Sequence, residues 1–206
     1  MKKFGCLLGA VLLGLTAFSF AACADGKDNG TTEDDANGVT AEERVLVAYF
    51  SCTEKTKGVA ETLHAQIEGS QLYRIVPAEP YTSADLNYSD STCRANREQN
   101  DPSARPAIDG RQEKIEEYDV IFIGYPIWWG QAPKIIYTFF ESYDYDFEGV
   151  TIIPFCTSGS SGIGSSATNL HSLAPSADWK AGARISGNNV SALIGQMKET
   201  QSGGSI

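Results

Sequence analysis

A group of anion-binding side chains follows the first strongly apolar run of the sequence, VLVAYF at residues 45–50. The group combines three hydroxyls with two ammonium groups: Ser51, Thr53, Lys55, Thr56 and Lys57. A helix pattern follows this group in the sequence. Because a helix N-terminus offers unpaired backbone N–H groups and a partial positive charge, this arrangement predicts a phosphate site. It lacks the Gly-Lys-Ser/Thr ending of a nucleotide triphosphatase loop. Simple helix capping is the alternative, although one threonine would be enough for a cap.

Two adjacent tryptophans mark a second loop, which reads GYPIWWGQAP over residues 124–133. Trp128 and Trp129 lie between Pro126 and Gly130, directly beyond an apolar run. Two neighbouring indoles in a loop cannot both be buried cheaply, so we expect one to pack inward and the other to face a cleft. A flat aromatic surface there suits a planar ligand. The alternative is that both indoles close the top of the sheet.

A third loop is rich in serine and glycine and reads CTSGSSGIGSS over residues 156–166. Its glycines allow a ligand to approach the backbone closely, and its serines supply hydrogen-bond donors. The glycine spacing, G-x-x-G-x-G, differs from the G-x-G-x-x-G dinucleotide fingerprint, and the G-x-S-x-G pattern of hydrolases is absent. The loop is therefore a candidate ligand contact, with a flexible connection into the next helix as the alternative.

Apolar runs and helical spacing alternate along the chain and would position these three loops. Strands are expected at 45–50, 72–76, 120–125, 150–156 and 179–185. Helices are expected near 59–67, 88–100, 133–143, 167–173 and 189–198, with a short one within 108–118. Continuously apolar strands are covered on both faces, so this order predicts a parallel sheet between two layers of helices. In such sheets ligands bind at the carboxyl ends of the strands, where all three loops lie.

Together, the three loops resemble those of the flavodoxin-like FMN-binding proteins, in particular the bacterial ones. The resemblance rests on the stretches YFSCTEKTKGVAE, IGYPIWWGQAPKIIYTFFES and PFCTSGSSGIG, which match the family in order and spacing. It extends over residues 45–197, nearly the whole expected domain. It implies an α/β fold: a doubly wound, five-stranded parallel sheet in the order 2-1-3-4-5, with helices on both faces and FMN at the carboxyl edge.

The resemblance also implies which residues contact FMN. The phosphate loop would run over residues 51–56, one side of the isoalloxazine ring would lie along 126–130, and its other edge along 157–162. The implied FMN-binding residues are Ser51, Cys52, Thr53, Glu54, Lys55, Thr56, Pro126, Ile127, Trp128, Trp129, Gly130, Thr157, Ser158, Gly159, Ser160 and Gly162. No side chain is implied as a general acid or base.

Glu54 departs from the family pattern, because it stands where the family commonly has glycine. A carboxylate about 6 Å from the phosphate would cost roughly 3 kcal/mol at an effective dielectric constant of about 20. We therefore expect Glu54 either to point outward or to be compensated by Lys55 or Lys57. The affinity for FMN is the property that this substitution affects.

The first 22 residues have the pattern of an export signal. Two lysines precede an uncharged stretch that ends in small residues before Cys23, as in a bacterial lipoprotein signal. We expect a signal peptide at 1–22, lipidation of Cys23, an acidic disordered tether at 23–44 and the flavodoxin-like domain at 45–206. A transmembrane anchor and ordinary secretion are the alternatives, and all three export the chain.

Charge and cysteine content argue against several other classes of protein. The formal net charge of -10 and the lack of basic clusters argue against nucleic acid as a partner. Contact with a membrane is therefore expected through the N-terminal lipid only. Cys52, Cys93 and Cys156 are an odd number for an exported domain, which argues against a disulfide framework. The two histidines and these cysteines show no metal-ligand spacing.

The sequence thus predicts an exported, membrane-anchored FMN protein that transfers electrons. Residues 128–131 and the serine/glycine loop form an apolar and nearly uncharged rim, which suits a small planar acceptor such as a quinone. One alternative is a flavodoxin-type electron carrier between redox proteins. The other is a flavin-free binding module, which Glu54 would favour.

Overall fold

The structure is a computed structural model that describes residues 43–202, with side chains described for residues 43–200. The expected signal peptide at 1–22 and the lipidation site Cys23 lie outside the described residues, as does nearly all of the expected tether at 23–44. The expected domain at 45–206 is therefore described up to residue 202.

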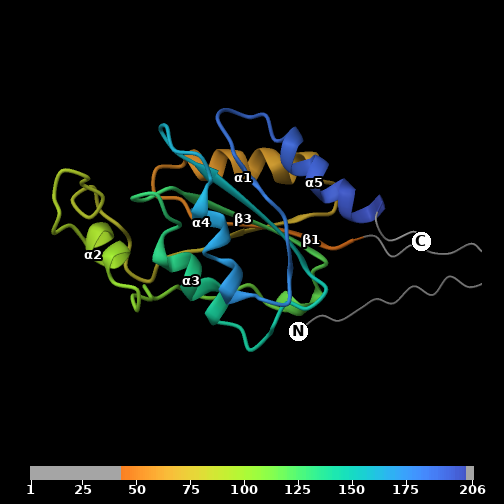
Figure 1. Cartoon of the computed structure of the whole chain (residues 1–206), viewed down its shortest axis with the longest axis horizontal. Helices are drawn as coiled ribbons and strands as arrows, with labels where there is room; N and C mark the ends of the chain where they lie inside the picture. The colour runs from red at the N-terminus through yellow and green to blue at the C-terminus, as the bar shows by residue number, and fades with distance from the viewer. Residues whose placement is uncertain (1–42, 203–206) are drawn as a thin grey trace, which may run out of the picture. The chain divides into compact units, whose positions relative to one another are not determined.

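A parallel sheet forms the centre of the described domain (Figure 1). Its strands are β1 (Val45–Tyr49), β2 (Gln71–Arg74), β3 (Val120–Pro126), β4 (Thr151–Thr157), β5 (Asp178–Trp179) and β6 (Ala183–Arg184). Their order is β2-β1-β3-β4-β5, with β6 also paired to β4. This is the doubly wound order 2-1-3-4-5 that the resemblance to the flavodoxin-like proteins implied. In the middle of the sheet the register pairs Leu46 with Ile121 and Ile121 with Ile152.

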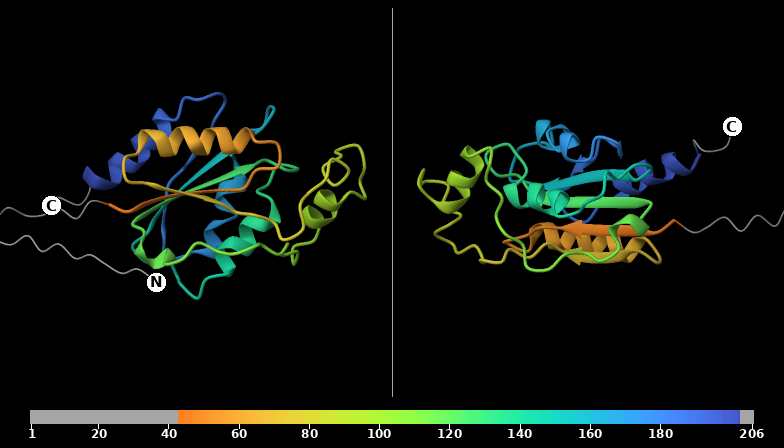
Figure 2. Two further views of the ribbon diagram at one scale, coloured as in Figure 1. Left: turned by 180° about the vertical axis from the view of Figure 1, so that it is seen from behind. Right: turned by 90° about the horizontal axis from the view of Figure 1, so that it is seen from below.

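Helices cover both faces of the sheet, because its central strands are apolar on both sides (Figure 2). The helices are α1 (Lys55–Gln66), α2 (Arg94–Asn100), α3 (Lys134–Glu141), α4 (Ser165–Thr168) and α5 (Ser191–Ser202), with 3₁₀ turns η1 (Ile115–Glu117) and η2 (His171–Leu173). Alternate residues of β1 face opposite sides. Val45, Val47 and Tyr49 pack with α1 and α5, whereas Leu46 and Ala48 pack with α3.

The fifth strand position is divided into β5 and β6, where the sequence predicted one strand at 179–185. Both segments pair in parallel with β4. The carbonyls of Ile152 and Cys156, two residues to either side of Pro154, accept hydrogen bonds from this edge. Pro154 has no N–H to donate to the same edge. Gly182 lies next to Pro154 and has a φ of 68°. A Cβ on Gly182 would lie 2.0 Å from the Pro154 carbonyl oxygen. The strand therefore breaks where Pro154 interrupts the ladder.

The segment between β2 and β3 projects beyond the carboxyl edge of the sheet and carries α2 (Figures 1 and 2). Its helix begins at Arg94 and not at the predicted residue 88. The residues before it form turns, in which the carboxylate of Asp90 accepts hydrogen bonds from the backbone and the hydroxyl of Thr92. Such local bonds compete with a helix. The short helix expected within 108–118 is the turn η1, and the helix expected at 167–173 is divided between α4 and η2.

Candidate functional site

Three loops, which follow β1, β3 and β4, meet at the carboxyl edge of the sheet around a cavity of about 420 Å³. The cavity is lined by Thr53, Lys55, Tyr88, Pro126, Ile127, Trp128, Trp129, Gly130, Thr157, Ser158, Gly159, Ser160 and Ser161. All three loops singled out in the sequence thus contribute to one hollow. The predicted contacts that lie outside this lining are Ser51, Cys52, Glu54, Thr56 and Gly162.

The N-terminus of α1 lies at one end of this cavity. The helix begins at Lys55, so the N–H groups of its first turn have no partner within the helix. Thr53 and Lys55 are both exposed and both line the cavity. This end of the cavity therefore has the hydroxyl, ammonium and N–H donors that an anionic group such as a phosphate needs.

Glu54 immediately precedes α1 and has a left-handed backbone, with a φ of 61°. Glycine adopts this conformation without steric cost, which gives a physical reason for the glycine that the family commonly has here. The Glu54 carboxylate pairs with Lys57 Nζ at 2.9 Å and with Arg74 Nη2 at 3.2 Å. The hydrogen bond from Lys57, followed by the charge of Arg74, lowers the pKa of Glu54. Lys57 and Arg74 therefore offset its charge, and Lys55 is left at the cavity.

Other residues of the first loop lie behind the cavity wall. Thr56 is buried, and its Oγ1 lies 2.8 Å from Oγ1 of Thr157. Ser51 and Cys52 line a neighbouring hollow of about 280 Å³, where Arg74 Nη2 donates to the Ser51 carbonyl at 3.1 Å. Burial raises the pKa of the Cys52 thiol to about 12, so the thiol is uncharged at neutral pH. These side chains support the loop and do not face the hollow that Thr53 and Lys55 line.

The tryptophan loop is a tight two-residue hairpin. Trp128 and Gln131 exchange backbone hydrogen bonds of 2.9 Å in both directions. Trp129 and Gly130 between them have positive φ values of 44° and 77°. Two successive positive φ values are typical of a type I′ turn, which glycine favours at its second central position. The turn therefore directs the two indoles to different places.

Trp128 packs inward, whereas Trp129 stays half-buried at the rim. Only 6% of Trp128 is exposed, and its ring meets Phe50 and Tyr81 edge-to-face at 5.5 and 5.1 Å. Gln99 of α2 supports the turn from outside, because its Nε2 donates to the Trp128 carbonyl at 3.0 Å. This division between one buried and one rim indole is the arrangement that the sequence predicted.

Tyr88 is a cavity residue that the sequence analysis missed. Its ring stacks on Trp129, with centroids 4.2 Å apart and planes 12° from parallel. Its hydroxyl donates to the Ile127 carbonyl and accepts from the Trp129 N–H, both at 3.2 Å. Tyr88 comes from the segment between β2 and β3, where the sequence predicted the start of a helix and the structure has turns. The one available signal was an aromatic residue isolated among polar neighbours in LNYSDS.

The serine/glycine loop is held from behind by Arg184, which the sequence analysis also missed. Arg184 lies in β6, and its Nη2 donates to the carbonyls of Ser158 and Gly159 at 3.1 and 3.2 Å. Both residues line the cavity, and Ser160 and Ser161 beside them are exposed. The loop thus presents hydroxyl and peptide groups to the hollow.

A sequence model of the flavodoxin family matches residues 44–200. The chain belongs to the flavodoxin family. This confirms the resemblance that was drawn from the three loops, and it agrees with the strand order of the sheet.

Several solved structures are similar to this chain. A Bacteroides eggerthii protein classed as a flavoprotein is 46% identical over 77% of this chain and 98% of its own, with a TM-score of 0.71. A counterpart from Bacteroides uniformis is 40% identical over 76% and 98%, with a TM-score of 0.69. A Lactobacillus acidophilus flavoprotein in complex with FMN is 22% identical over 78% and 98%, with a TM-score of 0.58, and shares the fold. No curated protein matched the chain.

The site of this flavodoxin-family domain differs in charge from the chain around it. The chain has a formal net charge of -10, whereas the described cavity lining contains Lys55 and no carboxylate. Within residues 43–202 there is no group of three or more side chains able to hold a metal ion. No helix of the same range is long and apolar enough to cross a membrane. Lys55 and the rim indole of Trp129 suit the cavity to an organic anion with a flat ring.

Proposed function

We propose that this chain binds FMN in the cavity at the carboxyl edge of the sheet and transfers electrons through it. The supporting observation is that two unlike surfaces meet around one cavity. One is the N-terminus of α1 with Thr53 and Lys55, and the other is the aromatic pair of Tyr88 and Trp129. A planar molecule that carries a phosphate needs both. The volume of about 420 Å³ falls within the range of about 300–1,000 Å³ that is typical of cofactor pockets.

The residues fit the parts of FMN by their chemistry. The first N–H groups of α1, the Thr53 hydroxyl and the Lys55 ammonium would hold the phosphate. The Trp129 indole and residues 157–161 would border the isoalloxazine ring. FMN, when bound, supplies the redox chemistry, and the protein binds it, orients it and sets its electrostatic surroundings. The Lactobacillus acidophilus flavoprotein, which has this fold, was solved in complex with FMN.

The test is an absorption spectrum of the full-length chain, purified in mild detergent and then supplied with FMN, FAD or riboflavin. We expect flavin bands and tighter retention of FMN than of riboflavin, because only FMN carries the phosphate. We also expect FAD to be retained poorly. A protein that stays colourless after FMN is added would refute the proposal and would favour a flavin-free binding module.

We further infer that the electron acceptor is a small planar molecule such as a quinone. Among the described residues that line the cavity, the charged one is Lys55. Trp129, Gly130 and Gln131 form a rim of aromatic and amide groups. Charged groups that steer a protein partner are therefore sparse at this rim. An electron carrier between redox proteins is the second candidate, because the chain belongs to the flavodoxin family.

These two candidates are separated by following the oxidation of pre-reduced protein. We expect a soluble benzoquinone to oxidise it faster than a redox protein such as cytochrome c does at equal concentration. Faster oxidation by the redox protein, with a strong dependence on salt, would favour the carrier.

We also propose that the chain is exported and anchored by a lipid on Cys23, which precedes an acidic, polar stretch. Metabolic labelling with a fatty acid should mark the full-length chain. The label should disappear in Cys23→Ser and persist in the matched variant Cys52→Ser. Retention of the label in Cys23→Ser would refute the proposed anchor.

A further inference from the structure

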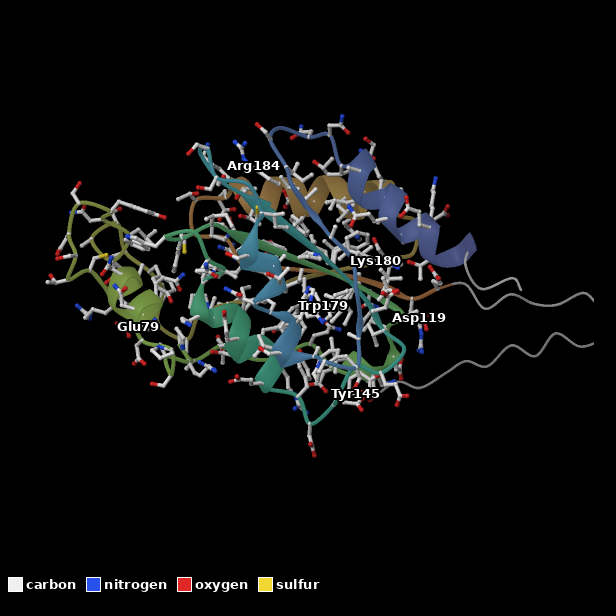
Figure 3. All side chains as sticks on the ribbon, in the orientation of Figure 1. Glu79, Asp119, Tyr145, Trp179, Lys180 and Arg184 are labelled. Atoms are coloured by element: carbon white, nitrogen blue, oxygen red, sulfur yellow. The ribbon has the colours of Figure 1, made fainter. Side chains whose placement is uncertain are left out.

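We propose that Arg184 raises the reduction potential of the flavin bound in the cavity, acting as a positioning residue behind the serine/glycine loop. This inference rests on the proposed function, because it concerns FMN held at that site. Arg184 belongs to β6 and lies beside the loop that follows β4 (Figure 3). It is not part of the cavity lining, so it would act through the loop and through its charge.

The guanidinium of Arg184 is bound to the wall of the cavity. Its Nη2 donates to the carbonyls of Ser158 and Gly159, and both of these residues line the hollow. In a trans peptide the carbonyl and the following N–H point in opposite directions. The N–H groups of Gly159 and Ser160 are therefore directed away from Arg184. Arg184 thus prepares two backbone donors for the edge of a flat ligand.

No carboxylate of the described residues forms an ion pair with Arg184. None of the ion pairs formed within residues 43–202 includes this side chain. Its Nε is buried without a hydrogen-bond partner in that part of the chain. A guanidinium stays protonated at every accessible pH, and a partly buried charge is screened less than an exposed one. A fixed positive charge therefore lies directly behind the loop.

The other charges near the cavity add to the positive charge of Arg184. Lys55 is the cation of the lining. The nearby carboxylate of Glu54 is paired with Lys57 and Arg74. The described lining therefore provides one cation and no carboxylate, in a chain with a net charge of -10. Such a lining stabilises a ligand most in its most negative state.

Reduction changes the charge of the flavin ring, so the positive charge of Arg184 would stabilise the reduced and oxidised rings to different extents. When two electrons and one proton are added to the neutral oxidised ring, the ring gains one negative charge. A nearby cation and aligned N–H donors stabilise the anionic ring more than the neutral one. The reduced flavin is then bound more tightly than the oxidised flavin, and the midpoint potential rises. The phosphate carries the same charge in both states and cancels from this comparison.

The test measures the two-electron midpoint potential of FMN bound to the full-length chain, with dithionite as the electron donor and a reference dye. Arg184→Gln should weaken the binding of reduced FMN about tenfold relative to oxidised FMN, which lowers the potential by about 30 mV. Arg184→Lys keeps the charge and should restore most of the shift. The control Lys198→Gln removes an equal charge from α5, near the end of the helix that lies away from the carboxyl edge. It should leave the potential unchanged.

Three outcomes would overturn the inference. An unaltered potential in Arg184→Gln, with both redox states weakened equally, would mean that Arg184 only supports the loop. An equal shift in Lys198→Gln would mean that net charge and not position matters. A wild-type chain that retains no FMN would instead refute the proposed function, and the inference with it. Circular dichroism of the flavin-free proteins checks folding, and Arg184→Met provides a second neutral variant should Arg184→Gln not fold.

Discussion

The hydroxyl oxygens of Thr56 and Thr157 lie 2.8 Å apart, although 101 residues separate them in the sequence. Thr56 lies in the first turn of α1 and Thr157 ends β4, and the two residues are only 1% and 9% exposed. The bond joins the loop after β1 to the loop after β4, across the position that β3 occupies between these strands. It therefore holds two walls of the cavity together.

The bond between these threonines predicts a measurable loss of stability. Thr56→Val should lower the free energy of unfolding by about 1–3 kcal/mol, because the buried Thr157 hydroxyl loses its partner. Urea denaturation followed by far-ultraviolet circular dichroism measures the change. Adding Thr157→Val should recover much of the loss, since the second change removes the unpaired hydroxyl. A double variant as unstable as the sum of the single variants would show that the bond contributes nothing.

Thr53 is the hydroxyl that we expect to contact phosphate. Thr53→Ala removes one hydrogen bond to a charged group, worth about 1.5–3 kcal/mol, so FMN should bind about 10- to 100-fold more weakly. The affinity for riboflavin should barely change, because riboflavin has no phosphate. Fluorescence titration measures both affinities. Thr62→Ala is the matched control, because the Thr62 hydroxyl of α1 donates to the Gly58 carbonyl outside the cavity lining, and it should leave both affinities unchanged. Equal weakening of the two flavins would show that Thr53 has only a structural role.

The ion pairs of Glu54 predict a pH-dependent contribution to stability. Pairing lowers the pKa of Glu54 in the folded state. Its contribution is therefore fully present above the ordinary pKa of a glutamate and is lost as the pH falls through the lowered folded-state pKa. Glu54→Gln should be less stable than wild type at pH 7, and the difference should disappear in acid. Urea denaturation at several pH values measures this difference, and a constant difference at all pH values would contradict it.

Glu54→Gly separates the effect of the backbone from that of the charge. This change removes the carboxylate but relieves the left-handed conformation, which glycine adopts without steric cost. At pH 7 it should therefore be more stable than Glu54→Gln. If the two variants unfold at the same urea concentration, the left-handed backbone at this position carries no strain.

The two neighbouring tryptophans should respond differently to truncation. Trp128→Ala should destabilise the fold by about 3–5 kcal/mol, because the indole is buried against Phe50 and Tyr81. Trp129→Ala should change stability little and should slow the reduction of a small quinone more than it impairs FMN retention. Thermal unfolding and stopped-flow absorbance measure these effects. Equal destabilisation by both changes would contradict the division between a core indole and a rim indole.

The layered fold could be predicted from the sequence because its signals are local. β1 is continuously apolar and β3 and β4 are nearly so, and a strand of that kind must be covered on both faces. Helical spacing between the strands then requires parallel strands, whose loops share one edge. The three loops of the cavity follow from this reasoning, and the resemblance to flavodoxins supplied the strand order. The prediction of a single strand at 179–185 was wrong, because Pro154 of β4 interrupts the pairing of a different strand, which is divided into β5 and β6.

The sequence by itself thus determined the class of fold, the edge that carries the site and the family. Only the tertiary structure decided which side chains complete the cavity. Tyr88 stacks on a residue 41 positions away, and Arg184 binds carbonyls 25 and 26 positions away. The structure also gives Thr56 a buried partner, Thr157, 101 positions away, and its contact with FMN stays a prediction. The physical reason is that periodicity reports the burial of a residue along its own element. The partner of a side chain depends instead on which distant segments the sheet brings to the same edge.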